Sequence, residues 1–455
     1  MVKTKFNIQN FIIVITALIM AALSFKSNYD GGDINLARSS YLGSDPIDLW
    51  GGFSGVFYGI LPNVLFPWGT WLLIIQIGFS TIGLILIRNS FINLNKSTLL
   101  IYGVISYSVL TFSSLLTRDA TMTSFYILGI GLLISSRKLS KINGNIVFVL
   151  GVTSIISAAA FRPWMIIAAL LPILFVRKID IKIVFLSFLL MLLPFVAENL
   201  ASKTKDFEKV HPELQVIIAD LSFVNCLSKD ELIRNNAARI LNKFSNSNYS
   251  SVEICKDFRL NNWASVGSWY FNSSELGLKS YNPEALAYSK IVISSNLSED
   301  LYIDIRNSWI KLVFENPKEY IQVKFLQANQ VLTSGDSFRF RLLSAYNFKT
   351  YLAGVVFLPF DILISLHLLS PLMTLLIGFC IVLTNLSNFK IGSVIRNPEL
   401  IFANIFVLFW IALTTIAYIG DNGRYTYLSS FVYYFLLVRG IDKLKNTISH
   451  TKFAN

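Results

Sequence analysis

The feature that most constrains this chain is a series of apolar runs of about the length needed to cross a lipid bilayer. A spanning helix needs roughly 20 apolar residues. Only 15% of the 455 residues are charged, against about 25% in an ordinary soluble protein. The sequence therefore predicts an all-α polytopic membrane protein. We expect about ten transmembrane helices, near residues 9–25, 68–88, 98–115, 120–136, 145–161, 163–177, 182–198, 362–387, 399–418 and 424–440.

The basic residues predict how these helices cross the membrane. The net charge is +12, but the lysines and arginines are dispersed over short connections, which does not favour nucleic acid as a partner. They are concentrated on every second connection, as the positive-inside rule requires of cytoplasmic loops. We therefore expect a multi-pass protein of a bacterial cytoplasmic membrane with both termini inside. The loop 26–67, the turns 117–119 and 161–163, and the connection 420–425 then face the periplasm or exterior.

Three regions follow from this topology. Residues 1–198 form an N-terminal transmembrane module that contains the first external loop, 26–67. Residues 199–346 form a large, mainly helical external domain, and residues 347–455 form a C-terminal transmembrane module. Within the external domain, residues 301–315 and 317–332 are predicted to form two amphipathic helices. The second is expected to begin at Pro317, because a proline is favourable at the first position of a helix. Cys226 and Cys255 are either a disulfide or two separate thiols.

Charged residues gather on the predicted outer face, where the cost of placing charge near lipid makes a functional site the default hypothesis. A carboxylate can act as a general base or hold a divalent cation, and the planar guanidinium group of arginine suits phosphate. The alternatives are interfacial anchors for the arginines and capping or turn acids for Asp45 and Asp48. The candidates are Asp30, Asp33, Arg38 and Asp45 in the first loop, Arg118, Asp119 and Arg162 in the next two turns, and Arg424 and Tyr425 in the last connection.

At these residues the sequence resembles the GT-C superfamily of polytopic glycosyltransferases, which use polyprenyl-phosphate-linked donors. The resemblance rests on the run from Asp33 to Arg38, on Asp45-Pro46, on Arg118-Asp119, on the Asn-Pro between Trp309 and Tyr320, and on Arg424-Tyr425. Ile34 stands where the family usually has a second acid, and Asp30 is the nearest replacement. The resemblance implies a GT-C-like helix bundle.

The resemblance also implies roles. Asp33 would remove the acceptor proton, and Asp119 would assist it. If a divalent cation (Mg or Mn) takes part, Asp33 and Asp119 would be its ligands. Arg118, Arg162 and Arg424 would bind the departing polyprenyl phosphate, while the substrate would also meet Asp30, Arg38, Asp45 and Tyr425. The partners would be a polyprenyl-phosphate-sugar donor, a glycan or lipid-linked acceptor, and membrane lipids.

Two alternatives compete with this hypothesis. An O-antigen or polysaccharide polymerase or ligase also has many helices and one large external loop, and it would rely on arginines of that loop: Arg234, Arg239, Arg259, Arg339 and Arg341. A lipid-linked sugar flippase or other transporter would place charges and broken helices near the membrane midplane, often in two related halves. Here the charges lie at helix ends and the two halves differ, which disfavours transport.

Overall fold

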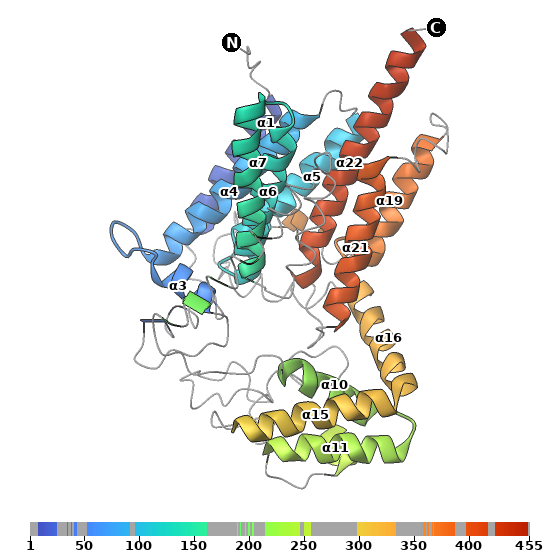
Figure 1. Cartoon of the computed structure of the whole chain (residues 1–455). Helices are drawn as coiled ribbons and strands as arrows, with labels where there is room; N and C mark the ends of the chain where they lie inside the picture. Colours follow the sequence, from blue (N-terminus) through green and yellow to red (C-terminus); the bar gives the residue numbers. More distant parts are fainter. Residues whose placement is uncertain are drawn as a thin grey trace. The chain divides into compact units, whose positions relative to one another are not determined.

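The computed structural model describes most of the predicted helices but little of the first loop. It describes residues 8–24, 52–91, 96–161, 214–245, 250–255, 298–333, 368–386, 397–416 and 424–453, and a few isolated positions between 34 and 42, between 189 and 203, and between 356 and 366. In these residues every regular element is a helix (Figure 1). The predicted all-α class is thereby confirmed.

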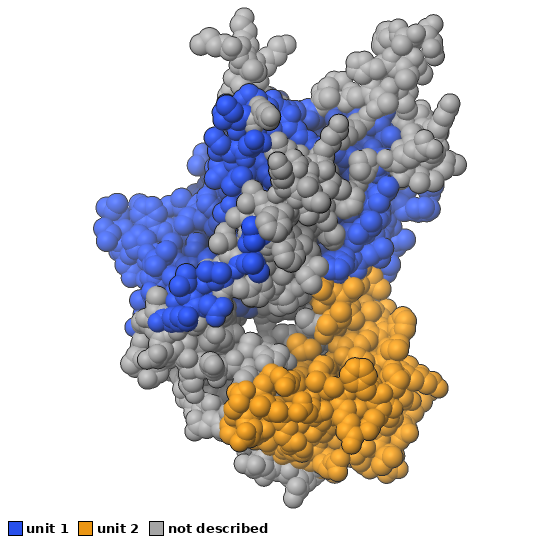
Figure 2. All heavy atoms as spheres, in the orientation of Figure 1, with its two compact units in different colours: residues 1–208, 338–410, 424–455 blue, residues 209–337, 411–423 orange. Residues whose placement is uncertain are grey.

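The chain divides into two compact units (Figure 2). Unit 1 comprises residues 1–208, 338–410 and 424–455, and unit 2 comprises residues 209–337 and 411–423. The helices of unit 1 are α1 (Ile8–Ser24), α3 (Gly52–Gly59), α4 (Trp68–Ser90), α5 (Lys96–Ser113), α6 (Arg118–Ser136), α7 (Lys141–Ala160), α19 (Pro371–Leu386) and α22 (Arg424–Phe453). Helix α21 (Pro398–Ile416) begins in unit 1 and ends in unit 2.

Four described helices are long and apolar enough to cross a membrane. They are Trp68–Ser90, Arg118–Ser136, Ile142–Ala160 and Glu399–Ile416. The described residues therefore do not reach the predicted count of ten spans. One reason is length, because Ile8–Ser24 and Thr98–Ser113 are apolar but shorter than a span of ordinary length. Another is that the predicted spans 163–177 and 182–198 lie almost wholly outside the described residues.

Glycines set the close packing of α4, α6 and α7. A Cβ atom on Gly131 of α6 would lie 2.7 Å from the carbonyl oxygen of Gly83 on α4. On α6 and α7, a Cβ atom on Gly129 would lie 2.9 Å from the carbonyl oxygen of Gly151. Small residues let helix backbones approach closely where lipid supplies no hydrophobic drive. Close backbone contacts therefore join α6 to both α4 and α7.

Unit 2 is built from shorter helices, α10 (Leu214–Leu227), α11 (Glu231–Ser245), α12 (Ser251–Cys255), α15 (Glu299–Glu315) and α16 (Pro317–Thr333). Helix α15 starts at an N-cap, where the Ser298 hydroxyl accepts a hydrogen bond from the Leu301 amide. Helix α16 starts at Pro317, so the predicted break between the two amphipathic helices is present. A disulfide joins Cys226 at the end of α10 to Cys255 of α12, which decides between the two alternatives for these thiols.

The region before α19 corrects one predicted boundary. The sequence predicted a span from 362 to 387, whereas the helix begins at Pro371 after a turn at 368–370. Proline has no amide hydrogen to donate and its fixed φ suits the first helical position. The Ser370 hydroxyl accepts from the amide of Met373 at 3.4 Å, so the residue before the proline also caps the helix.

Candidate functional site

The structure describes three of the predicted site residues with their side chains: Arg38, Arg118 and Asp119. Arg424 and Tyr425 form the start of α22, and their side chains lie outside the description. The remaining predicted site residues, Asp30, Asp33, Asp45 and Arg162, lie outside the described residues. The described part of the site therefore lies at the ends of α3, α6, α7 and α22, all of which belong to unit 1.

Arg38 is held at the C-terminal end of α3. Its side chain is 7% exposed, and its guanidinium donates to the carbonyl oxygen of Tyr58 and, at 3.1 Å, to that of Leu61. The guanidinium carbon also lies 4.9 Å from the ring centroid of Trp68. The last carbonyls of a helix lack partners within the helix and favour a cation. Arg38 therefore fastens the first loop to the end of α3 and to the start of α4.

The N-terminus of α6 presents Arg118 and Asp119. Thr117 is the N-cap, and its hydroxyl accepts a hydrogen bond from the amide of Ala120 at 3.1 Å. Asp119 follows in the first turn and is 1% exposed, while Arg118 is half-buried. A carboxylate is favourable at a helix N-terminus, where unpaired amides carry a partial positive charge. The local sequence Thr-Arg-Asp thus both starts the helix and fixes the acid in place.

A polar bridge joins the Arg38 end of α3 to the Asp119 turn of α6. The hydroxyl of Tyr58, whose carbonyl Arg38 binds, lies 3.3 Å from the hydroxyl of Thr121. Thr121 donates in turn to the carbonyl oxygen of Thr117, the N-cap of α6, at 3.1 Å. The amide group of Gln76 on α4 lies 2.7 Å from the same Thr121 hydroxyl. Two predicted parts of the site, far apart in sequence, are therefore linked through Tyr58 and Thr121.

Aromatic contacts bring the end of α7 to the same place. The ring of Phe161 lies 5.1 Å from that of Phe57 and 5.4 Å from that of Phe53, centroid to centroid, both on α3. Phe161 directly precedes the predicted site residue Arg162 in the sequence. It is also completely buried. The turn that follows α7 therefore starts beside α3.

The first turn of α22 packs against the last turn of α5. Tyr427, three residues after Arg424, is completely buried and packs its ring 5.7 Å from that of Phe112. Phe112 lies in the last turn of α5, and α6 begins at Arg118 a few residues later. The first turn of α22 is thereby placed near the N-terminus of α6. The described parts of all four predicted segments thus converge on one end of unit 1.

Sequence reasoning missed Tyr58, Gln76 and Thr121, which make the bridge. Gln76 carried a usable signal, since a lone amide in an apolar helix needs a partner. Tyr58 and Thr121 carried none, because their meeting depends on how α3 packs against α6. A serine cluster behind the bridge, Ser80, Ser113 and Ser124, joins α4, α5 and α6 through hydroxyl contacts of 2.6 to 3.2 Å.

A second polar cluster, in unit 2, was also missed. Asp220 on α10 is completely buried, and its carboxylate accepts from the Tyr320 hydroxyl at 2.7 Å and from the Lys324 ammonium at 2.6 Å. Burial raises the pKa of the Asp220 carboxyl, and the charge of Lys324 opposes that rise. Lys324 also donates to the carbonyl oxygens of Thr415 and Ile416 at the end of α21, at 3.3 and 3.2 Å. The signal was Asp220 itself, an acid inside an apolar run.

The described residues offer little to a metal ion. No group of three or more His, Cys, Asp or Glu side chains among them could hold one. Asp119 alone is too small a donor set for a divalent cation, which usually takes several oxygens. The other predicted ligand, Asp33, lies outside the described residues, so the Asp33–Asp119 metal site stays a prediction.

The structure describes two of the five arginines of the polymerase hypothesis, both on α11. Among those the structure describes, Arg239 is exposed on α11 and Arg234 donates to the Ser228 carbonyl oxygen at 3.4 Å. Arg259, Arg339 and Arg341 lie outside the described residues.

Comparison of the chain with protein-family models, with curated proteins and with solved structures gives no match.

Proposed function

We propose that this chain is a membrane glycosyltransferase of the GT-C type, which moves a sugar from a polyprenyl-phosphate-linked donor to a glycan or lipid-linked acceptor. The observation that carries the proposal is the convergence in unit 1. Arg38, the Arg118-Asp119 turn, the end of α7 before Arg162 and the first turn of α22 all meet at one end of the helices. A phosphate-bearing lipid with a sugar needs cations, an acid and a hydrocarbon environment together.

In the proposed reaction, Asp33 takes the proton from an acceptor hydroxyl as its oxygen attacks the anomeric carbon of the donor sugar. The bond between that carbon and the phosphate oxygen breaks, and the polyprenyl phosphate leaves with the electron pair. Arg118, Arg162 and Arg424 stabilise the charge of the leaving phosphate. Asp119, fixed in the first turn of α6, assists Asp33. The guanidinium of Arg38, five residues after Asp33 in the sequence, is bound at the end of α3.

The proposed setting is the outer face of a bacterial cytoplasmic membrane, with about ten spans and residues 199–346 as an external domain. The Cys226–Cys255 disulfide supports an oxidising compartment for that domain. The apolar tip after α3 supports an interfacial position for the first loop, since Val64 and Leu65 are 70% and 84% exposed. The distribution of lysine and arginine supports an inward-facing C-terminal tail.

The experiment uses purified full-length protein in lipid nanodiscs and a radiolabelled polyprenyl-phosphate sugar. Release of label to water or to an added glycan reports transfer even before the natural acceptor is identified. We expect Asp33→Asn to lower this release by about 100- to 10,000-fold, because a positioned base is lost. Asp119→Asn should lower it as well, by a smaller factor.

The matched control is Asp300→Asn, which changes an exposed first-turn acid of α15 in unit 2 and should leave release unchanged. Wild-type rates in both Asp33→Asn and Asp119→Asn would overturn the proposal. A failure of the wild-type protein to consume any of several polyprenyl-phosphate sugars would do the same.

A further inference from the structure

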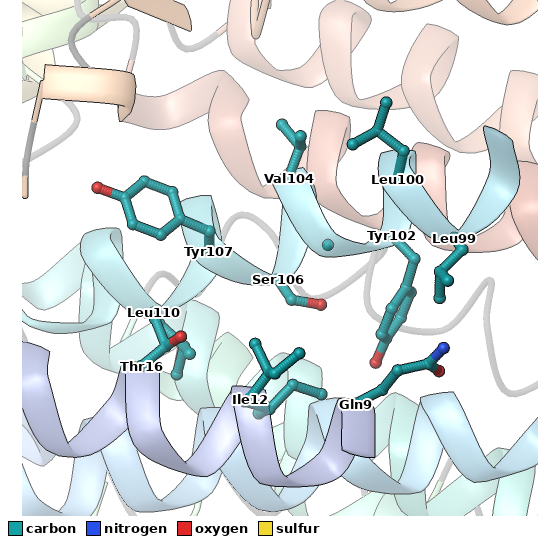
Figure 3. A pocket seen from close by; sticks show the side chains of 12 residues that line it. Gln9, Ile12, Thr16, Leu99, Leu100, Tyr102, Val104, Ser106, Tyr107 and Leu110 are labelled. Carbon is teal, nitrogen blue, oxygen red and sulfur yellow. The ribbon is translucent and has the colours of Figure 1, made fainter. Parts of the chain in front are cut away.

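An apolar groove lies between α1 and α5 in unit 1 (Figure 3). Its volume is about 580 Å³, within the usual range for small-molecule sites. The side chains that form its walls are mostly aliphatic, among them Ile12, Ile13, Leu100, Val104 and Leu110. Several remain exposed, with Ile12 at 56% and Leu100 at 69%. The groove is therefore a hollow built for hydrocarbon.

Gly103 keeps the middle of the groove open. No heavy atom lies within 4 Å of the position that a Cβ atom would take on this glycine. From Leu99 to Leu110 the groove follows α5 for roughly 17 Å, at 1.5 Å per helical residue. An apolar hollow of this length suits one extended hydrocarbon chain better than a compact ligand.

One end of the groove is polar and cationic. Gln9, which lines the groove on α1, accepts a hydrogen bond from the guanidinium of Arg88 at the end of α4. The next residue, Asn10, donates to the side-chain oxygen of Asn89 at 3.0 Å. The exposed Lys138 ammonium donates to the Asn89 carbonyl oxygen at 2.7 Å. Two cations therefore flank the polar end of the groove.

The described acidic side chains near this end are fewer than the described cations. Asp442 of α22 lies close enough to act electrostatically on Arg88 and on Lys138. Arg439, also on α22, pairs with Glu399 at 3.6 Å. Arg137 lies close enough to Arg439 and to Glu399 to act electrostatically on each of them. Among the side chains that the structure describes here, four cations (Arg88, Arg137, Lys138 and Arg439) accompany two acids (Glu399 and Asp442), which leaves positive charge for an anionic ligand.

From this arrangement we infer that the groove binds an anionic phospholipid, with one acyl chain along α5 and the phosphate headgroup against Arg88 and Lys138. The aliphatic walls recognise the chain, and the excess positive charge distinguishes an anionic headgroup from a zwitterionic one. Binding here ties α1 to α5 and to the ends of α4 and α6. The inference does not depend on the proposed sugar transfer.

The test is native mass spectrometry of the full-length protein titrated with dioleoyl-phosphatidylglycerol or dioleoyl-phosphatidylcholine. We expect the wild-type protein to bind the anionic lipid more tightly than the zwitterionic lipid. Lys138→Gln should weaken binding of the anionic lipid by about fivefold, as expected for one basic residue near a lipid headgroup. Gly103→Trp should fill the groove and abolish tight binding of both lipids.

Gly78→Trp is the matched control, because Gly78 on α4 also faces open space but does not line the groove. It should bind both lipids like the wild-type protein. If Gly103→Trp does not fold, Lys138→Gln and Arg88→Gln still test the headgroup end. Equal affinities for the two lipids in the wild-type protein would overturn the inference. So would an unchanged preference in Lys138→Gln and Arg88→Gln, or displacement of the lipid by inorganic phosphate alone.

Discussion

The ammonium of Lys324 on α16 lies 2.6 Å from a carboxylate oxygen of Asp220 on α10, although 104 residues separate the two in the chain. The Asp220 side chain is completely buried and the Lys324 side chain is 15% exposed. Another pair, Lys243 and Asp304, has nearly the same separation, 2.7 Å, but its side chains are 34% and 56% exposed. Among its described residues, unit 2 therefore contains one buried and one largely exposed lysine–aspartate pair.

This difference predicts unequal effects of removing each lysine. Lys324→Met leaves the buried Asp220 carboxylate without its cation and should lower the free energy of unfolding by about 3–5 kcal/mol. Lys243→Met should cost less than about 1 kcal/mol, as for surface pairs. Hydrogen exchange of peptides from α10 and α11 in the full-length protein measures both. Equal effects of the two substitutions would show that the Asp220–Lys324 pair is no more important than a surface pair.

The loss of stability that Lys324→Met causes, relative to the wild-type protein, should become smaller in acid. Burial raises the pKa of Asp220 above its ordinary value of 3.8, and loss of the opposing lysine raises it further. A folded pKa above the unfolded one means that the folded state binds the proton more tightly. The stability gained from that proton is complete below pH 3.8 and is lost as pH rises through the folded pKa.

The measurement is the thermal midpoint of Lys324→Met minus that of the wild-type protein, followed from neutral pH downwards. The variant's midpoint should lie well below that of the wild-type protein at neutral pH, and this gap should become smaller as the pH falls. In the double variant Asp220→Asn/Lys324→Met, which lacks the titrating carboxyl, this recovery should be absent. A difference that stays constant with pH in the single variant would contradict the assigned role of Asp220.

The sequence predicted the helices better than the contacts between them. Hydrophobic runs located α4 and α6 to within a few residues, and Pro317 located the start of α16, because these signals are local. The Asp220–Lys324 pair and the Tyr58–Thr121 bridge depend on which helix faces which, and no local period contains that information. For the same reason its place in the first loop did not predict that the Arg38 guanidinium binds carbonyl oxygens at the end of α3, and its substrate role stays a prediction.

The glycines between α4 and α6 give a packing prediction. A Cβ atom on Gly131 would meet the Gly83 carbonyl oxygen at 2.7 Å and its Cα at 3.0 Å. Both are backbone atoms, so Gly131→Ala must push the helices apart, at a cost of about 1–3 kcal/mol. Gly78→Ala on α4 meets open space and should be neutral or slightly stabilising, since alanine favours a helix. Thermal unfolding in one detergent compares the two, and a Gly131→Ala variant as stable as Gly78→Ala would refute the close approach.

The bridge from Tyr58 to Thr121 gives the last prediction, which rests on the proposed function. Tyr58→Phe removes the hydroxyl that lies 3.3 Å from Thr121, and with it the polar contact between the end of α3, where Arg38 is bound, and the first turns of α6. One hydrogen bond contributes about 1 kcal/mol to stability, so the thermal midpoint should fall only slightly. Release of labelled sugar should fall by tenfold or more, because a small displacement of a catalytic loop is costly.

Tyr126→Phe is the control for this substitution. Tyr126 is also a buried tyrosine and lies on α6, but its hydroxyl has no hydrogen-bond partner among the described residues. Loss of this hydroxyl should change neither the thermal midpoint nor sugar release by a measurable amount. If Tyr58→Phe lowers the thermal midpoint but leaves sugar release at the level of Tyr126→Phe, the bridge serves packing alone. A fall in release in Tyr58→Phe but not in Tyr126→Phe supports a role for the bridge in positioning the first loop against α6.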